Sequence, residues 1–201
     1  MKRKEKGQVD FLIGNHELMM IKSLFLNDDK ECKIWTSKDN MGNVTRENFE
    51  KLSKEEQSKL KDFLLDSYVY KNINVNSQKI HLVHAKAVQD KDDDYNKTVR
   101  EMLAEGNANL LFDAVWSRDT DGESPHKKSA KPGYFTIIGH SPTKGNRVNY
   151  KYGYLDIDCG VGKSEADPDR SVSLVNLTKG IVKYFNVNRQ RKKAKNKQQE
   201  K

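Results

Sequence analysis

Blocks of hydrophobic and polar positions along the first third of the chain predict a short strand followed by helices. The apolar run 9–13 predicts a buried strand, and residues 16–26 continue from it as a helix. Residues 28–44 are polar and rich in turn residues, so we expect a loop there. An apolar stripe at helical spacing predicts one long amphipathic helix over residues 45–67, with Thr45 at its N-cap.

The remainder of the chain contains mostly apolar runs of strand length, separated by polar loops. The expected strands are 79–84, 133–140, 150–160, 171–177 and 180–187, and a helix is expected within 98–115. The last two strands are joined by the turn 178–180, which indicates a hairpin. Strand–helix units thus come first and antiparallel strands later, which predicts a layered α/β domain with sheet packed on sheet.

Charge is concentrated at the two ends of the chain. Its length of 201 residues suits one domain, and the formal net charge is +8. The excess of Lys and Arg lies in residues 1–6 and 189–201, whereas 7–188 are close to neutral. We expect residues 7–188 to form the folded domain and 189–201 to be a basic disordered tail. A nucleic-acid groove is not expected in the domain; weak contacts of the tail with nucleic acid or anionic lipid stay open.

Cysteine use and hydropathy favour a cytoplasmic protein. Cys32 and Cys159 are too few for a disulfide framework or a thiolate metal site, and fit a reducing compartment. No stretch approaches the roughly 18 apolar residues that span a bilayer, so no membrane partner is expected. The basic N-terminus lacks the apolar core of a secretory signal.

Three predicted strands end at groups of similar chemistry. The first leads into Gly14 and Asn15, the second ends at His84, and the third ends at Gly139 and His140. Functional groups of α/β folds gather beyond the carboxyl ends of strands. Asn15, His84 and His140 would offer one amide oxygen and two imidazole nitrogens, a set that suits manganese, iron or zinc. The two glycines could provide close backbone approach or a positive φ.

Each of these histidines also has a simpler interpretation, because a single histidine at a strand end is more often structural than a ligand. His81 lies three positions before His84, and alternation places it on the opposite face of the strand. His126 lies in a polar loop and is expected to be solvated. The coincidence of three strand ends is what favours a metal site.

The motifs GNHE, HLVHA and IIGHSPT, in this order, resemble the later metal-binding motifs of the calcineurin-like metallophosphoesterases. The phosphoprotein phosphatase branch, with its bacterial and phage protein phosphatases and symmetrical diadenosine-tetraphosphate hydrolases, is the most similar. The segments WTSKDNMGNVT, VWSR and LDIDCG resemble further family segments in the expected order. The resemblance covers roughly residues 9–185.

The resemblance implies a β-sandwich flanked by helices. It also implies hydrolysis, by metal-activated water, of a phosphomonoester such as that of a phosphorylated protein, or of a nucleotide anhydride. Asn15, His84 and His140 would bind the second of two divalent metal ions. His16 would protonate the leaving-group oxygen, and Arg118 would hold a phosphate oxygen. These roles agree with the chemistry of imidazole, guanidinium and paired cations.

Three carboxylates near these motifs could have a structural or a functional role. Glu17 could orient its neighbours at the start of a helix or take part in catalysis. Asp156 and Asp158 share a strand face, and we interpret them as structural, with Asp158 near the site.

The family also has two earlier motifs, of the forms GDxHG and GDxxDRG, which supply the ligands of the first metal and a bridging carboxylate. Only eight residues precede Val9, and none belongs to such a motif, so the chain is expected to be an N-terminally truncated member. Three neutral ligands compensate the charge of a dication poorly, and activity should be impaired. Two alternatives stay open. The chain could be a non-catalytic remnant that acts as a binding or regulatory fragment, or an inactive partner that completes its sheet with another chain.

Overall fold

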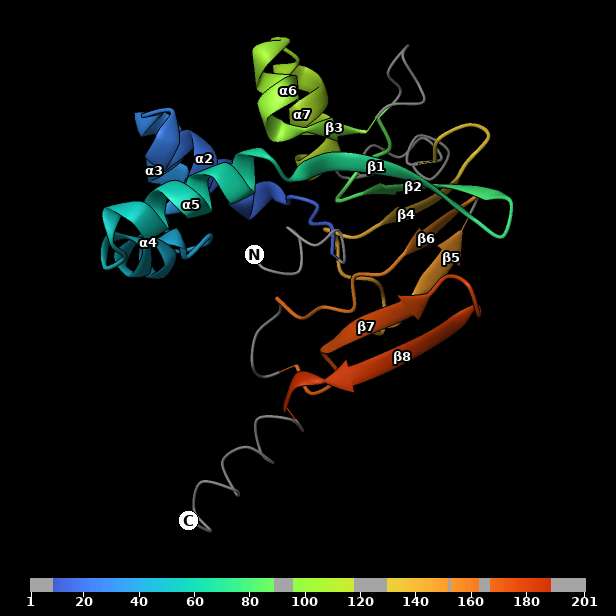
Figure 1. The fold of residues 1–201 in the computed structure, drawn as a ribbon. Coiled ribbons are helices and arrows are strands. Elements are labelled where there is room, and N and C mark those ends of the chain that lie inside the picture. The colour runs from blue at the N-terminus through green and yellow to red at the C-terminus, as the bar shows by residue number, and fades with distance from the viewer. Residues whose placement is uncertain (1–8, 89–95, 118–129, 152, 163–166, 189–201) are drawn as a thin grey trace. The chain divides into compact units, whose positions relative to one another are not determined.

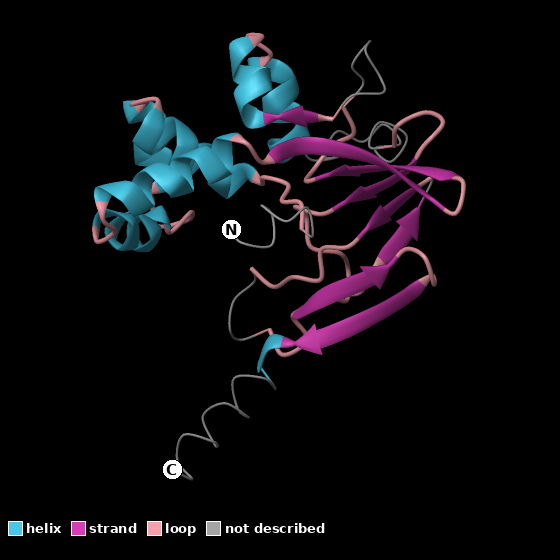
Figure 2. Cartoon of the chain, viewed as in Figure 1, coloured by secondary structure: helices cyan, strands magenta, loops and turns pink. Residues whose placement is uncertain are grey.

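The computed structural model describes residues 9–88, 96–117, 130–151, 153–162 and 167–188. It confirms the α/β class, with helices, a mixed six-stranded sheet and a separate two-stranded sheet (Figures 1 and 2). The described chain divides into two compact units. The first contains residues up to 71 together with 88–117, and the second contains residues 72–87 together with the described part of the chain beyond 130.

The first unit consists mainly of helices around one apolar core. They are α2 (Asn15–Phe25), α3 (Asp29–Trp35), α4 (Gly42–Glu50), α5 (Lys54–Leu65), α6 (Val99–Ala104) and α7 (Ala108–Trp116). Helix α2 packs against α3, α5 and α7. It contributes Leu18, Met19 and Ile21 to the core, all of them buried. The expected helix after the first apolar run is therefore confirmed.

The expected buried strand over residues 9–13 is reduced to a single parallel bridge between Leu12 and Tyr68. Two backbone hydrogen bonds form it, from the Ile13 N–H to the Tyr68 carbonyl at 3.0 Å and from the Tyr68 N–H to the Phe11 carbonyl at 2.9 Å. Val9 remains 45% exposed. The prediction was wrong in extent because only the central part of this run has a strand to pair with.

The predicted loop 28–44 contains helix α3, which the polar composition of this segment concealed. The Asp28 carboxylate accepts the N–H of Glu31 at 3.0 Å and so caps the helix. The helix ends at Trp35, whose side chain is 2% exposed. A capping aspartate followed by one strongly buried side chain was enough to stabilise a helix without a long apolar stripe.

The predicted long helix over residues 45–67 is two helices, α4 and α5, separated at Ser53. The Glu56 carboxylate accepts the Ser53 N–H at 2.9 Å, and the Ser53 hydroxyl accepts the Glu56 N–H at 3.3 Å. This capping box starts a new helix, although the apolar stripe continues across it. Thr45 lies inside α4, whose N-cap is Met41 with a left-handed backbone (φ +54°).

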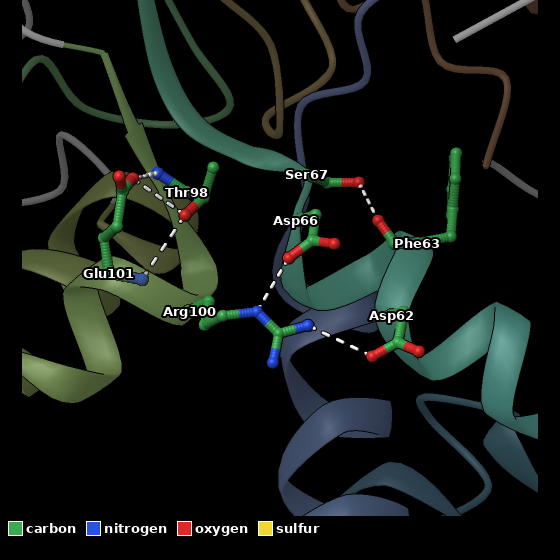
Figure 3. Close-up of polar contacts among 7 residues, drawn as sticks. All are labelled: Asp62, Phe63, Asp66, Ser67, Thr98, Arg100 and Glu101. Atoms are coloured by element: carbon green, nitrogen blue, oxygen red, sulfur yellow. Dashed lines mark hydrogen bonds and ion pairs between the residues drawn. The ribbon is translucent and has the colours of Figure 1, made fainter. Parts of the chain in front are cut away.

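Polar contacts connect α5 with α6 inside the first unit (Figure 3). Arg100 donates to the Asp66 carboxylate at 2.7 Å and to the Asp62 carboxylate at 3.1 Å. Helix α6 begins at a second capping box, in which the Glu101 carboxylate accepts the Thr98 N–H at 2.7 Å. The ion pairs are about half exposed, so their contribution to stability is small.

The strands confirm most of the predicted apolar runs and add two that were not predicted, the first and the third in chain order. They are β1 (Tyr68–Val75), β2 (Gln78–Val83), β3 (Lys97–Thr98), β4 (Phe135–Ile138), β5 (Asn149–Lys151), β6 (Tyr154–Asp156), β7 (Ser171–Asn176) and β8 (Ile181–Asn186). Strand β1 was not predicted, and it contributes residues to both units. The single strand expected over 150–160 is two short antiparallel strands, β5 and β6.

The strand order of the larger sheet is β3-β1-β2-β4-β6-β5. Strand β4 is parallel to both β2 and β6, whereas β5 is antiparallel to β6. The predicted hairpin of the last two strands is confirmed, and β7 and β8 form a sheet of their own. Among the helices of the described residues, none has the length and apolarity that a bilayer-spanning segment needs.

Candidate functional site

In the second unit, His84 and His140 lie close together beyond the carboxyl ends of two neighbouring strands. Strands β2 and β4 are adjacent and parallel, with Ile80 opposite Phe135 in the register, so their carboxyl ends lie side by side (Figure 1). His84 and His140 follow these ends directly. Their ring centres are 5.1 Å apart and the ring planes are inclined by 59°. Both side chains are half-buried, which leaves them accessible to a ligand.

The separation of the two rings is compatible with joint binding of one metal ion. With metal–nitrogen bonds of about 2.1 Å, two imidazoles on a tetrahedral or octahedral ion have ring centres about 4.5–5.3 Å apart. The observed 5.1 Å lies in this range. The residues present therefore fit two ligands of a transition metal, and imidazole suits zinc, iron and manganese.

His140 has an unusual backbone conformation. Its φ is +70°, and the N–H of Ser141 donates to the Gly139 carbonyl at 2.8 Å, which closes a three-residue turn around His140. A residue with a Cβ atom is strained there, by roughly 1–2 kcal/mol. A positive φ was considered for Gly14 or Gly139. The φ of Gly14 is −110°, and Gly139 has no positive φ either. The residue with the positive φ is His140 itself.

Neighbouring backbone groups hold this strained turn. The Gly139 N–H donates to the His84 carbonyl at 2.8 Å, which connects the two histidine-bearing segments. After the turn, the Thr143 N–H donates to the Asp158 carbonyl at 3.0 Å. The buried Thr143 hydroxyl lies 2.6 Å from the Arg147 carbonyl. Sequence analysis did not single out Thr143; its place in the segment GHSPT was the only signal.

Asp156 and Asp158 stabilise the chain beyond β6. The Asp156 carboxylate accepts the Asp158 N–H at 3.0 Å, and the Asp158 carboxylate accepts the Gly160 N–H at 2.9 Å. A Cβ atom placed on Gly139 would lie 3.9 Å from the Cβ atom of Asp158. Asp158 is therefore next to the His140 turn, while its hydrogen bond shapes the turn that follows.

Asn15, His16 and Glu17 form the first turn of α2 in the first unit. Asn15 is buried and His16 is exposed. The Glu17 carboxylate accepts the Gly14 N–H at 2.8 Å, so it caps the helix start. The expected metal ligands are thus divided between the units, with Asn15 in the first and the imidazole pair in the second.

Several expected groups fall on segments for which no structure is described. Arg118, His126 and the basic tail 189–201 lie outside the described residues. Within the described residues, no three or more His, Cys, Asp or Glu side chains are grouped so that they could hold a metal ion. The observed candidate centre is accordingly the imidazole pair.

His81 occupies a structural position, as its place in the strand predicted. Its side chain is fully buried, and Nδ1 lies 2.7 Å from Oδ1 of Asn72. Its ring also meets the ring of Tyr134 edge-on, with centres 6.3 Å apart. A buried imidazole with these contacts is part of the packing of the sheet.

Comparison with protein-family models and with curated proteins yields no match for this chain. The assignment of a function therefore depends on the order of the motifs and on the geometry of the imidazole pair.

Proposed function

We propose that the chain is a metal-dependent phosphoesterase of the phosphoprotein phosphatase type, in which His84 and His140 bind one divalent metal ion. The observation that carries this proposal is the approach of the two imidazole rings to 5.1 Å at the carboxyl ends of adjacent parallel strands. The strained turn at His140 adds support, since strained backbone is common where a side chain has to be aimed at a ligand.

The proposed fold is the β-sandwich of the metallophosphoesterases over residues 7–188, with 189–201 as a basic tail. The two separate sheets, most of whose strands belong to the second unit, are compatible with it. The Ser173 hydroxyl on β7 donates to the Ile157 carbonyl just beyond β6 at 2.7 Å, so the small sheet is attached to the chain that leaves the large one. A cytoplasmic location belongs to this proposal, and Cys32 and Cys159 are free thiols in the structure.

Residues of this chain would bind and position the substrate as follows. By the family resemblance, Asn15 would be a metal ligand, and Arg118 would hold a phosphate oxygen in two-point geometry. His16 is exposed at the start of α2, and its imidazole would donate a proton to the departing oxygen. A bound manganese, iron or zinc ion would supply charge neutralisation at the phosphate and an activated water.

In the described part of the chain, no carboxylate forms a metal-binding group with the imidazole pair, so we expect slow turnover of phosphomonoesters. Among the described residues, no group of three or more His, Cys, Asp or Glu side chains could hold a metal ion, and this favours a second candidate function. In that case the chain is a non-catalytic phosphatase remnant that acts as a binding or regulatory fragment and holds metal weakly.

The two functions differ in a turnover assay of the full chain. Purified protein is incubated with manganese chloride and p-nitrophenyl phosphate, and bound metal is measured by calorimetry. The phosphoesterase should hydrolyse the substrate, and His140→Ala and His84→Ala should each abolish hydrolysis. Lys183→Gln, an exposed change on β8, is the control and should keep the wild-type rate.

The outcomes separate the candidates. Hydrolysis that His140→Ala removes supports the enzyme. Metal binding that depends on His84 and His140 without hydrolysis supports the remnant. Hydrolysis that persists in both His84→Ala and His140→Ala indicates a contaminating enzyme. If the protein in addition binds no metal, the proposed function is overturned.

A further inference from the structure

A groove lies at the end of β2 and β4 opposite to the imidazole pair. It has a volume of about 440 Å³ and is lined by residues that precede or begin strands, among them Ser77, Gln78, Lys79, Gly133 and Tyr134. We call it the turn groove. Lys79 and His84 are five positions apart, which corresponds to about 16 Å along β2. The turn groove is therefore distinct from the candidate metal centre.

Three tight turns contribute residues to the walls of the turn groove. Ser77 has a φ of +64° in the β1–β2 hairpin, Gly133 has +77° ahead of β4, and Gly153 has +87° between β5 and β6. A Cβ atom on Gly133 would meet no atom within 4 Å, so open space lies next to its backbone. Backbone N–H groups at such turns are accessible to a bound anion.

In the described part of the chain, lysine side chains border the turn groove. Two ammonium groups flank the ring of Tyr134, with Lys79 Nζ 5.5 Å and Lys131 Nζ 5.0 Å from its centre. Lys79 is exposed, whereas Lys131 is only 3% exposed. The lining residues include no Asp or Glu. An anion in the turn groove would therefore meet positive charge without a competing carboxylate in the lining.

The turn groove also offers neutral and aromatic contacts. Ser77 and Gln78 provide a hydroxyl and an amide, and both can hydrogen bond to oxygen atoms. Phe135 belongs to the lining, and its ring stacks on that of Tyr150 at 5.8 Å with planes inclined by 16°. The volume lies in the range of sites for small molecules.

From these features we infer that the turn groove binds a small phosphate-bearing anion up to the size of a mononucleotide. Lys79, the lysine in the lining, would attract the phosphate, since lysine recognises phosphate as a compact positive charge. The aromatic wall formed by Tyr134 and Phe135 would contact an organic group attached to the phosphate. This binding goes beyond the proposed phosphoesterase function, because it requires neither a metal ion nor the two imidazoles.

The inference is tested with the ¹⁵N-labelled full chain in the presence of EDTA, by following amide shifts in a titration. The probes are inorganic phosphate, AMP and adenosine. Inorganic phosphate and AMP should shift the amides of Lys79, Gly133 and Gly153 in a saturable manner, and adenosine should not. Tighter binding of AMP than of inorganic phosphate would identify an organic phosphate as the ligand, and equal binding would identify the free anion.

Three variants make the test specific. Lys79→Gln changes an exposed side chain and should weaken phosphate binding at least tenfold. Lys183→Gln removes an equally exposed lysine on β8, outside the lining, and should leave binding unchanged. His140→Ala should also leave it unchanged, so a failure here is distinguishable from a failure of the proposed function.

Three results would overturn the inference. They are shifts that never saturate, an equal loss of binding in Lys79→Gln and Lys183→Gln, and a loss of the amide shifts in His140→Ala. The second would show attraction to the general surface charge, and the third would place the anion at the imidazole pair.

Discussion

The imidazole rings of His84 and His140 lie 5.1 Å apart because the strands that carry them are hydrogen-bonded neighbours running in the same direction. The Gly139 N–H donates to the His84 carbonyl, so the backbone contact continues to the last residue before the strained turn. The relative position of the two rings is therefore determined by the sheet, and flexible loops have little part in it.

Replacement of His140 by glycine should stabilise the protein relative to replacement by alanine. Alanine keeps the Cβ atom that strains the backbone at φ +70°, whereas glycine adopts this conformation freely. We expect the free energy of unfolding of His140→Gly to exceed that of His140→Ala by about 1 kcal/mol. Urea denaturation of both variants measures the difference. Equal stabilities would show that the turn is not strained in solution.

Gly42 should tolerate no larger side chain. A Cβ atom at this first residue of α4 would lie 2.5 Å from the carbonyl oxygen of Trp35 and 2.6 Å from its indole ring. Because the Trp35 side chain is buried, the overlap cannot be relieved by rotation into solvent. Gly42→Ala should lower the free energy of unfolding by about 2 kcal/mol.

Gly162→Ala is the matched control, since a Cβ atom there meets nothing within 4 Å. Thermal unfolding should place this variant within about 0.5 kcal/mol of the wild type. If Gly42→Ala unfolded at the same temperature as Gly162→Ala, the close approach of Trp35 would be refuted.

The capping box of α6 should make stability depend on acid pH. Hydrogen bonds from the Thr98 backbone and hydroxyl hold the pKa of Glu101 below its ordinary value of 4.5. A lowered pKa in the folded state stabilises the fold above the ordinary carboxyl pKa, and this contribution is lost as the pH falls through the folded-state pKa. Glu101→Gln should therefore be less stable than the wild type at pH 7, and the difference should shrink below about pH 4.5.

Denaturation at several pH values between 3 and 7 measures this effect. Thr98→Ser keeps the hydroxyl and should retain the pH dependence of the wild type. A stability difference between Glu101→Gln and the wild type that stayed constant with pH would contradict the role of the ionised carboxylate.

Cys159 should be inert in the folded protein. Its side chain is 2% exposed, and burial raises the pKa of the thiol, which disfavours the reactive thiolate. In Cys32→Ser, where Cys159 is the remaining thiol, reaction with a disulfide reagent should be at least about a hundredfold slower in native buffer than in denaturant. Comparable rates in the two conditions would show that the region around β6 and β7 opens readily.

Sequence patterns predicted those elements whose signal is local. The α2 helix and the β7–β8 hairpin were found because an apolar period or a turn residue marks each of them. The break at Ser53 was missed, although its capping box with Glu56 is visible in the sequence, because the apolar stripe continues on both sides. Strand β1 was missed because its polar positions, such as Asn72, interrupt the alternation.

By itself, the sequence determined the chemical nature of the candidate site, since the motif order singled out Asn15, His84 and His140 and the glycines beside them. Only the tertiary structure decided that His84 and His140 are neighbours, that the positive φ belongs to His140, and that Glu17 caps a helix. Local patterns encode the period of a strand or helix, whereas the pairing of β2 with β4 joins residues far apart in the chain. Such pairing depends on which strands bury each other's apolar faces, and no short segment contains that information.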